Sequence, residues 1–128
     1  MPNYPSKNVS TIRSYFAEIL GTFILVFIGT GAVITALNIG NGLTVQGIIL
    51  ISLTFGLTLS TIIYSLGPIS GAHLNPAVSI AATIAGKLKA RHLIPYILMQ
   101  LIGAFIASLF ILVITGGTFG LGTNTTGG

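Results

Sequence analysis

The stretch GPISGAHLNPAVSIAATIAG, residues 67–86, decides the fold of this chain. Its first half is rich in glycine and proline, which interrupt helices. Asn75 and Pro76 then supply the residue types preferred just before a helix and at its first position. We therefore predict a helix over 76–86, which at about 1.5 Å per residue is about 16 Å long, half of a hydrocarbon core of roughly 30 Å.

The composition is that of a membrane protein. Of the 128 residues, 52% are hydrophobic and 5% are charged, whereas soluble domains carry about a quarter charged residues. So little charge cannot cover a water-facing surface, and lipid must therefore surround most of the chain. The chain has no cysteine, which excludes a disulfide framework and a thiolate metal site, and we expect no metal and no cofactor.

Apolar runs of spanning length lie on both sides of the break. The predicted fold is an all-α membrane protein with three transmembrane helices and one re-entrant half-helix. The predicted organisation is a cytoplasmic tail over 1–12, a single repeat over 13–116 with spans 13–37, 45–66 and 92–115 and half-helix 76–86, and an extracytoplasmic Gly/Thr tail over 117–128.

Small residues recur at four-residue spacing on all three spans. Such pairs let helix backbones approach closely in lipid, and the alternative is the general richness of membrane helices in glycine and alanine. The pairs are Ala17 and Gly21, Gly56 and Ser60, and Gly103 and Ala107.

The basic residues predict the orientation. Lys7 and Arg13 precede the first span, and Lys87, Lys89 and Arg91 separate the half-helix from the third span. All five then lie on one face, which the positive-inside rule assigns to the cytoplasm. We predict a cytoplasmic N-terminus and an extracytoplasmic C-terminus in the plasma membrane. The same placement explains the net charge of +4 without a nucleic-acid partner.

A helix that begins inside the membrane at Asn75-Pro76-Ala77 has chemical consequences. Its first N–H groups are unpaired, and it carries about half a positive charge. In lipid such an end must be buried in protein or line a wet cavity. Free carbonyls before it and an amide donor beside it form a polar stripe suited to water or a small neutral solute, and the positive helix end repels cations and protons.

Residues 70–78, SGAHLNPAV, resemble the first signature of the aquaporin (major intrinsic protein) family, S-G-x-H-x-N-P-A-V. Residues 17–22 resemble the family's first-helix A-E-x-x-G-T, 54–57 its second-helix A-F-G-L, and 100–104 its third-helix Q-x-x-G-A. The resemblance covers roughly residues 14–116 and implies one repeat of the aquaporin-like inverted-repeat fold.

The resemblance also implies roles for residues of the break. Asn75 would donate its side-chain amide to pore water at mid-channel, and backbone carbonyls of the preceding loop would line the vestibule. The pore-lining residues so implied are Asn75, Pro76, Ala77, Gly71, Ala72 and His73.

Three further residues receive roles from the resemblance. Phe55 falls where the family has the aromatic of its outer constriction, with plain packing as the alternative. Glu18, the sole acid, would accept hydrogen bonds that brace the re-entrant loop, and the alternative is that it snorkels to the interface. Gln100 would brace the loop as well, unless it is only an interhelical hydrogen-bonding residue.

These features favour a passive channel, or the first half of one, for water and small neutral solutes such as glycerol. We expect no enzyme activity, because no nucleophile–base pair can be drawn from the residues. One alternative is a non-conducting truncated aquaporin fragment or assembly subunit. Another is a secondary transporter with a broken helix, which would need coupling residues, and Glu18 is the only acid.

The resemblance covers one repeat of a family that has two. The second NPA, the fifth-span residue and the constriction arginine of the complete family have no counterpart in this sequence. The expected partners are therefore the lipid bilayer, the permeant solute, and either a second aquaporin half or further copies of this chain, since the complete family forms tetramers.

Overall fold

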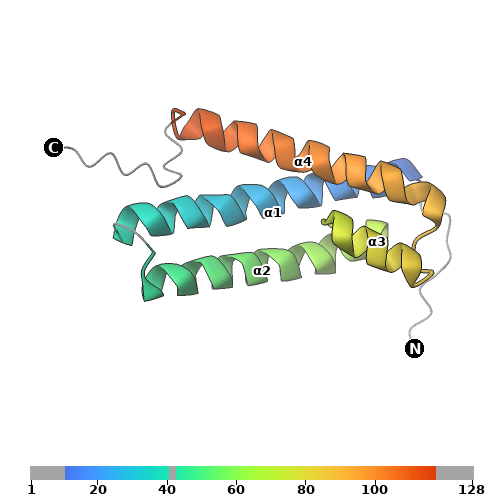
Figure 1. Ribbon diagram of the computed structural model, residues 1–128, viewed down its shortest axis with the longest axis horizontal. Helices are drawn as coiled ribbons and strands as arrows, with labels where there is room; N and C mark the ends of the chain where they lie inside the picture. The colour runs from blue at the N-terminus through green and yellow to red at the C-terminus, as the bar shows by residue number, and fades with distance from the viewer. Residues whose placement is uncertain (1–10, 41–42, 118–128) are drawn as a thin grey trace.

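The computed structural model describes residues 11–40 and 43–117. Within them the chain is helical, with α1 over Thr11–Gly40, α2 over Val45–Ser70, the short α3 over Pro76–Ile84, the 3₁₀ turn η1 over Ala90–His92 and α4 over Leu93–Ile114 (Figure 1). The described residues contain no strand. Most of the two predicted tails, 1–12 and 117–128, lies outside these residues.

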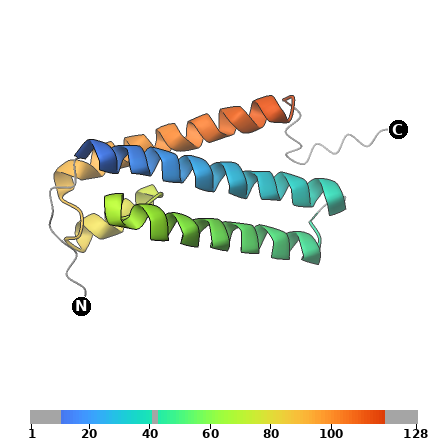
Figure 2. The ribbon, with the colours of Figure 1, turned by 180° about the vertical axis from the view of Figure 1, so that it is seen from behind.

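The long helices form a sheaf with α1 in the middle. Both views show α2 on one side of α1 and α4 on the other (Figures 1 and 2). The short α3 lies at the end of the sheaf where α1 begins, beside the end of α2 and the start of α4 (Figure 1). All three long helices have the length and apolar composition needed to cross a membrane, so the predicted three spans and one half-helix are confirmed.

The break begins later than the sequence predicted. We expected it from Gly67 onward, but α2 runs through Gly67 and Pro68 to Ser70. A proline in the last turn removes one helical hydrogen bond, and its fixed φ suits a helix. The helix ends at Gly71, whose φ of 90° lies in the left-handed region and whose N–H donates to the Gly67 carbonyl at 2.8 Å.

The half-helix is shorter than predicted and the third span begins one residue later. α3 ends at Ile84 rather than at residue 86, because Gly86 adopts a φ of 71° and closes the turn after it. The turn η1 then redirects the chain, and α4 begins at Leu93. These shifts leave the half-helix confined to one end of the sheaf.

Close packing between long helices occurs at two of the three predicted small-residue pairs. Ala17, Gly21, Gly103 and Ala107 are all buried. A Cβ added at Gly103 would collide with the carbonyl oxygen of Ile19, so only glycine permits this approach of α4 to α1.

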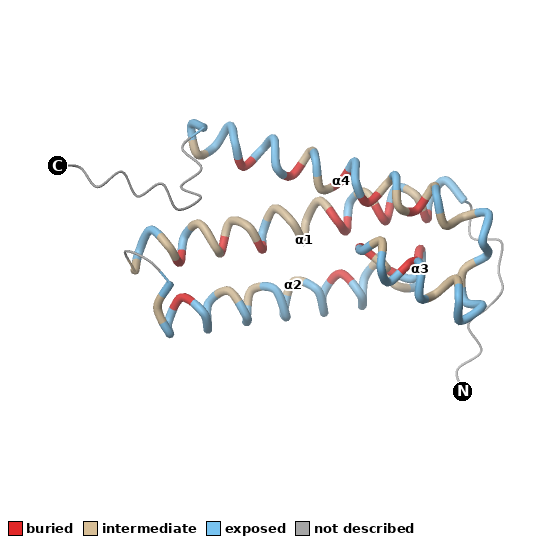
Figure 3. The backbone as a smooth tube through the Cα atoms, viewed as in Figure 1, coloured by how far each residue is buried: buried red, intermediate tan, exposed pale blue. Residues whose placement is uncertain are grey.

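The prediction for Gly56 and Ser60 was wrong within this chain. Nothing lies within 4 Å of a Cβ built at Gly56, and Ser60 is exposed. The buried residues follow the α1 sides that face α4 and α2 and gather around α3, while the outer surface of α2 is largely exposed (Figure 3). Exposed apolar side chains on all three spans are what lipid requires.

Candidate functional site

The loop that connects α2 to α3 contains strained backbone. Ala72 and Leu74 have φ values of 46° and 56°, in the left-handed region that side chains other than glycine rarely adopt. Each such residue costs roughly 1–3 kcal/mol and persists only where its surroundings hold it. Here the carboxylate of Glu18 holds the loop, by accepting hydrogen bonds from its backbone.

Glu18 is 0% exposed and accepts hydrogen bonds from the end of α2, from the loop and from α4. Its Oε1 accepts from Ser70 Oγ at 2.7 Å and from the His73 N–H at 2.9 Å. Its Oε2 accepts from the Leu74 N–H at 2.8 Å and from Gln100 Nε2 at 2.8 Å. The left-handed turn aims two successive N–H groups at one anion, which is the geometry of a backbone nest.

A buried hydroxyl continues this network into the half-helix. Ser79 is 0% exposed, and its Oγ accepts from Gln100 Nε2 at 2.9 Å and pairs with His73 Nδ1 at 3.1 Å. Because a hydroxyl both donates and accepts, this bond can form with either tautomer of the neutral His73 ring. Burial lowers the pKa of His73 and thereby favours this neutral ring, although the Glu18 carboxylate opposes the shift.

Two more side chains satisfy the last carbonyls of α2. The Tyr96 hydroxyl donates to the Ser70 carbonyl at 2.7 Å, and Ser14 Oγ donates to the Ile69 carbonyl at 3.0 Å. Carbonyls at a helix end have no partner in their own helix. These bonds therefore fix the end of α2 to α4 and α1, and with it the point where the loop starts.

Asn75 caps the half-helix in one amide orientation. Its Oδ1 accepts from the Ala77 N–H at 2.8 Å, and Pro76 follows as the first helical residue. The cap uses the oxygen, so the Nδ2 donor points away from the helix, and Asn75 is exposed. Among the described residues nothing accepts from that nitrogen.

The loop carbonyls are similarly unoccupied. Within residues 11–40 and 43–117, no hydrogen bond reaches the carbonyl oxygens of Gly71, Ala72 or His73. Gly71 is exposed, His73 is half-buried, and the Ala72 side chain is buried against Ile62 and Leu74. The predicted residues of the break, from Gly71 to Ala77, thus form one continuous segment that is exposed at Gly71, Asn75 and Ala77 and buried at Ala72 and Leu74.

Phe55 lies apart from this segment. Fifteen residues separate it from the end of α2, which corresponds to about 22 Å of helix. Its ring packs against Gly29 of α1, where a Cβ would collide with the ring, yet the side chain is 38% exposed. Phe55 is thus partly packed against α1 and partly exposed, which fits either alternative, and its constriction role stays a prediction.

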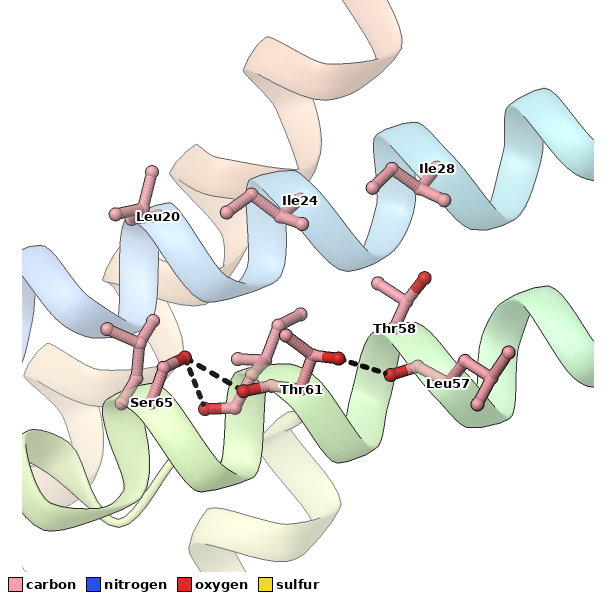
Figure 4. Close-up of a pocket in the computed structure, with 9 residues that line it drawn as sticks. Leu20, Ile24, Ile28, Leu57, Thr58, Thr61 and Ser65 are labelled. Atoms are coloured by element: carbon pink, nitrogen blue, oxygen red, sulfur yellow. Dashed lines mark hydrogen bonds between the residues drawn. The ribbon is translucent and has the colours of Figure 1, made fainter.

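A separate groove of about 350 Å³ runs between α1 and α2 (Figure 4). Thr61 Oγ1 donates to the Leu57 carbonyl and Ser65 Oγ to the Thr61 carbonyl, so these hydroxyls are satisfied within α2. The groove contains none of the predicted pore-lining residues. Its lining is Leu20, Ile24, Ile28, Leu57, Thr58, Thr61, Ile62, Ser65 and Leu66.

Sequence reasoning missed Ser79, Ser70, Tyr96 and Ser14. A signal existed for Ser79, because it is one of only two hydroxyl residues in the half-helix, with Thr83, and lies one turn after Asn75. The bonds made by the other three depend on which helix faces which. No local pattern in the sequence carries that information.

Three apolar spans and a half-helix that is tied to a buried carboxylate define a polytopic α-helical membrane protein with a re-entrant segment. The family model of the major intrinsic proteins matches residues 5–127. The chain belongs to the major intrinsic protein family.

Similar proteins include Aquaporin Z of Photorhabdus laumondii, 44% identical over 117 residues, where the match covers 91% of this chain and 49% of that protein. Aquaporin NIP1-1 of Arabidopsis thaliana is 40% identical over 103 residues, 80% of this chain and 34% of that protein. The X-ray structure of the aquaglyceroporin from Plasmodium falciparum superposes with a TM-score of 0.71 at 34% identity, over 84% of this chain and 43% of that one. The chain spans about half, or less, of the length of these relatives.

Proposed function

We propose that this chain forms one half of a passive membrane channel for water and small neutral solutes, with the segment from Gly71 to Ala77 as its polar path. The observation that carries the proposal is the capped amide of Asn75. Its oxygen is committed to the Ala77 N–H, so its nitrogen is held outward as a donor. A fixed donor can orient a water molecule without binding it tightly.

The loop supplies the complementary acceptors. The free carbonyl oxygens of Gly71, Ala72 and His73 precede the amide donor along the chain. A solute that is both donor and acceptor, such as water or a polyol, can move along such a stripe by exchanging partners. A cation would meet the positive end of α3 at the same point. No bond is made or broken in this process.

The buried network holds the path rigid. Glu18, Gln100 and Ser79 connect α1, the loop, α3 and α4 through bonds of 2.7–2.9 Å. The strained residues Ala72 and Leu74 keep their carbonyl directions only while this network is intact. We assign Glu18 and Gln100 the loop-bracing role for this reason, and Ser79 the same role.

The other half of the channel comes from outside the described residues. The start of α3 is exposed at Asn75 and Ala77, and in lipid an open helix start needs a protein partner or a wet cavity. The similar proteins are about twice as long as this chain. We propose that a second aquaporin-type half covers this face, and that complete pores assemble as an oligomer.

The orientation follows from charge. Arg13, Lys87, Lys89 and Arg91 lie at the end of the sheaf that holds α3, and the opposite end of the described residues has no charged side chain. By the positive-inside rule this end faces the cytoplasm of the cell membrane. The solute path would thus enter the half-helix region from the cytoplasmic side.

Osmotic shrinkage of proteoliposomes tests the proposal. Asn75→Asp keeps a good N-cap but removes the outward N–H donor and places an anion on the path. We expect it to reduce the water permeability above the empty-liposome level by about tenfold, which is about 1.4 kcal/mol. Asn38→Asp, the same change at an exposed residue near the end of α1, is the matched control and should leave permeability unchanged.

One result would show that the second half is required for conduction, and another would contradict the proposed path. Correctly inserted chain that is no more permeable than empty liposomes would exclude conduction by this chain alone. Equal permeability of the Asn75→Asp and Asn38→Asp variants would exclude the amide donor as a pore element.

A further inference from the structure

A small polar cleft lies at the basic end of the sheaf and has no part in the solute path. It measures about 70 Å³ and separates the first turns of α1 from the corner where η1 meets α4. Its lining is Thr11, Ser14, Tyr15, Leu88, His92 and Tyr96. Residues from both sides of the cleft are hydrogen-bonded to each other across it, through His92.

The bonds of His92 define its tautomer. Arg91 Nε can only donate, and it lies 3.2 Å from His92 Nε2, so this ring nitrogen is the acceptor. In the neutral ring the proton is then on Nδ1, which lies 3.0 Å from the Tyr15 hydroxyl. Tyr15 therefore accepts from His92, and its own proton remains available for another acceptor.

The cleft thus presents donors without acceptors. The lining supplies the Tyr15 proton and the Thr11 hydroxyl. Arg91 is not part of the lining, but it is hydrogen-bonded to His92 and brings the two terminal nitrogens of its guanidinium beside the cleft. None of these groups has an acceptor among the described residues. A carboxylate of this chain cannot fill the gap either, because Glu18, its only acid, is 0% exposed and already accepts from other donors.

The charge around the cleft indicates an anionic ligand with several oxygens. Lys87, Lys89 and Arg91 are all exposed on the turn that borders it. A guanidinium held on one side by Nε has two parallel N–H groups free, which fit two oxygens of a phosphate.

The position of the cleft indicates where that phosphate comes from. Ile12 and Phe16 alternate with the cleft residues of α1, and Ile94 with those of α4, and they are 69%, 69% and 63% exposed. Polar donors at the end of two spans that also carry exposed apolar side chains match a headgroup joined to acyl chains.

We propose that this cleft binds the phosphate of an anionic phospholipid, with Arg91, Tyr15 and Thr11 as donors and His92 as the residue that positions the first two. The site shares no residue with the segment from Gly71 to Ala77, and the residues changed in its test are not those that anchor the loop. It would dock the first turn of α1 and the start of α4 to the lipid headgroup layer at one fixed point.

Native mass spectrometry of the full chain in detergent micelles tests this, with dioleoyl phosphatidylglycerol and dioleoyl phosphatidylcholine as probes. We expect phosphatidylglycerol to bind about tenfold more tightly, and Arg91→Gln to remove most of that difference. Tyr15→Phe should weaken binding about threefold, as expected for one lost hydrogen bond. Lys87→Gln removes the same charge from the neighbouring turn, at a residue that is not bonded to His92 as Arg91 is, and should change binding by less than about twofold.

Each contrary result overturns a part of the proposal. Equal binding of both lipids would exclude an anion site. Equal effects of Arg91→Gln and Lys87→Gln would show diffuse attraction to the basic end instead of a built site. Displacement of the lipid by millimolar inorganic phosphate would assign the cleft to a soluble anion. Unchanged helix content by circular dichroism establishes that each variant is folded.

Discussion

Replacing Glu18 by glutamine exchanges one carboxylate oxygen for an NH₂ group at the centre of four donors. If the nitrogen takes the Oε1 position, the Ser70 hydroxyl can rotate to accept, but the His73 N–H faces another donor. If it takes the Oε2 position, the Gln100 amide can turn its oxygen toward it, but the Leu74 N–H faces a donor instead. Either arrangement leaves one backbone N–H of the strained loop without an acceptor.

The expected loss of stability follows from this one unpaired N–H group and the lost charge on its partner. A hydrogen bond to a charged group contributes about 1.5–3 kcal/mol, and a buried donor left unpaired costs about 1–3 kcal/mol. We expect Glu18→Gln to lower the free energy of unfolding by about 3 kcal/mol. The left-handed conformations of Ala72 and Leu74 lose part of their support in the same step, so permeability should fall together with stability.

Equilibrium unfolding in mixed detergent micelles measures the stability, and proteoliposome shrinkage measures permeability on the same preparations. Ser108→Ala is the control, because Ser108 is exposed and bonds only to the Ala104 carbonyl of its own helix. It should change stability by less than about 0.5 kcal/mol. A Glu18→Gln variant that is as stable as the control would refute the reasoning, since it would mean that the loop N–H groups find other acceptors.

Three further predictions concern the same fold. Ser79→Ala should lower the free energy of unfolding by about 1–2 kcal/mol, because Gln100 and His73 lose a shared partner. Ser79→Thr should not restore stability, since no space remains beside a residue that is 0% exposed. Gly103→Ala should destabilise by about 1–3 kcal/mol and weaken α1–α4 crosslinking yields, whereas Gly56→Ala, with nothing within 4 Å, should be neutral or slightly stabilising. Because the folded pKa of His73 is below its ordinary value of 6.5, the unfolded chain takes up a proton first. Stability should therefore fall as pH drops below about 6.5, an effect that His73→Gln should flatten in the same unfolding assay.

Composition and span length were enough to predict the helices and the half-helix, because lipid permits few backbone arrangements. Residue chemistry was enough for Asn75 and Pro76, since capping is local. The prediction from residue chemistry was wrong at Pro68. Proline and glycine favour a helix end there, but α2 continues to Ser70 because Ser14 and Tyr96 of other helices bond to its last carbonyls. Such bonds join residues 55 and 26 positions apart and leave no periodic trace.

The dependence on helix arrangement also explains why some small-residue pairs pack closely and another does not. Gly56 with Ser60 and Gly103 with Ala107 have the same spacing, and each pair is a glycine followed by another small residue. Gly103 meets the α1 backbone, while Gly56 meets nothing in the described chain. Spacing shows that a helix can be approached closely, but only the arrangement of the helices shows which side is approached.

The partners of Glu18 also set an order of events during synthesis. The carboxylate is in α1, which leaves the ribosome before the other described helices, yet its nearest donor in the chain, Ser70, follows 52 residues later, and Gln100 follows 82 residues later. Until then α1 carries an unsatisfied acid that lipid rejects. We therefore expect α1 to stay beside the insertion machinery until α4 has emerged, because only then are all the hydrogen-bond donors of Glu18 in place.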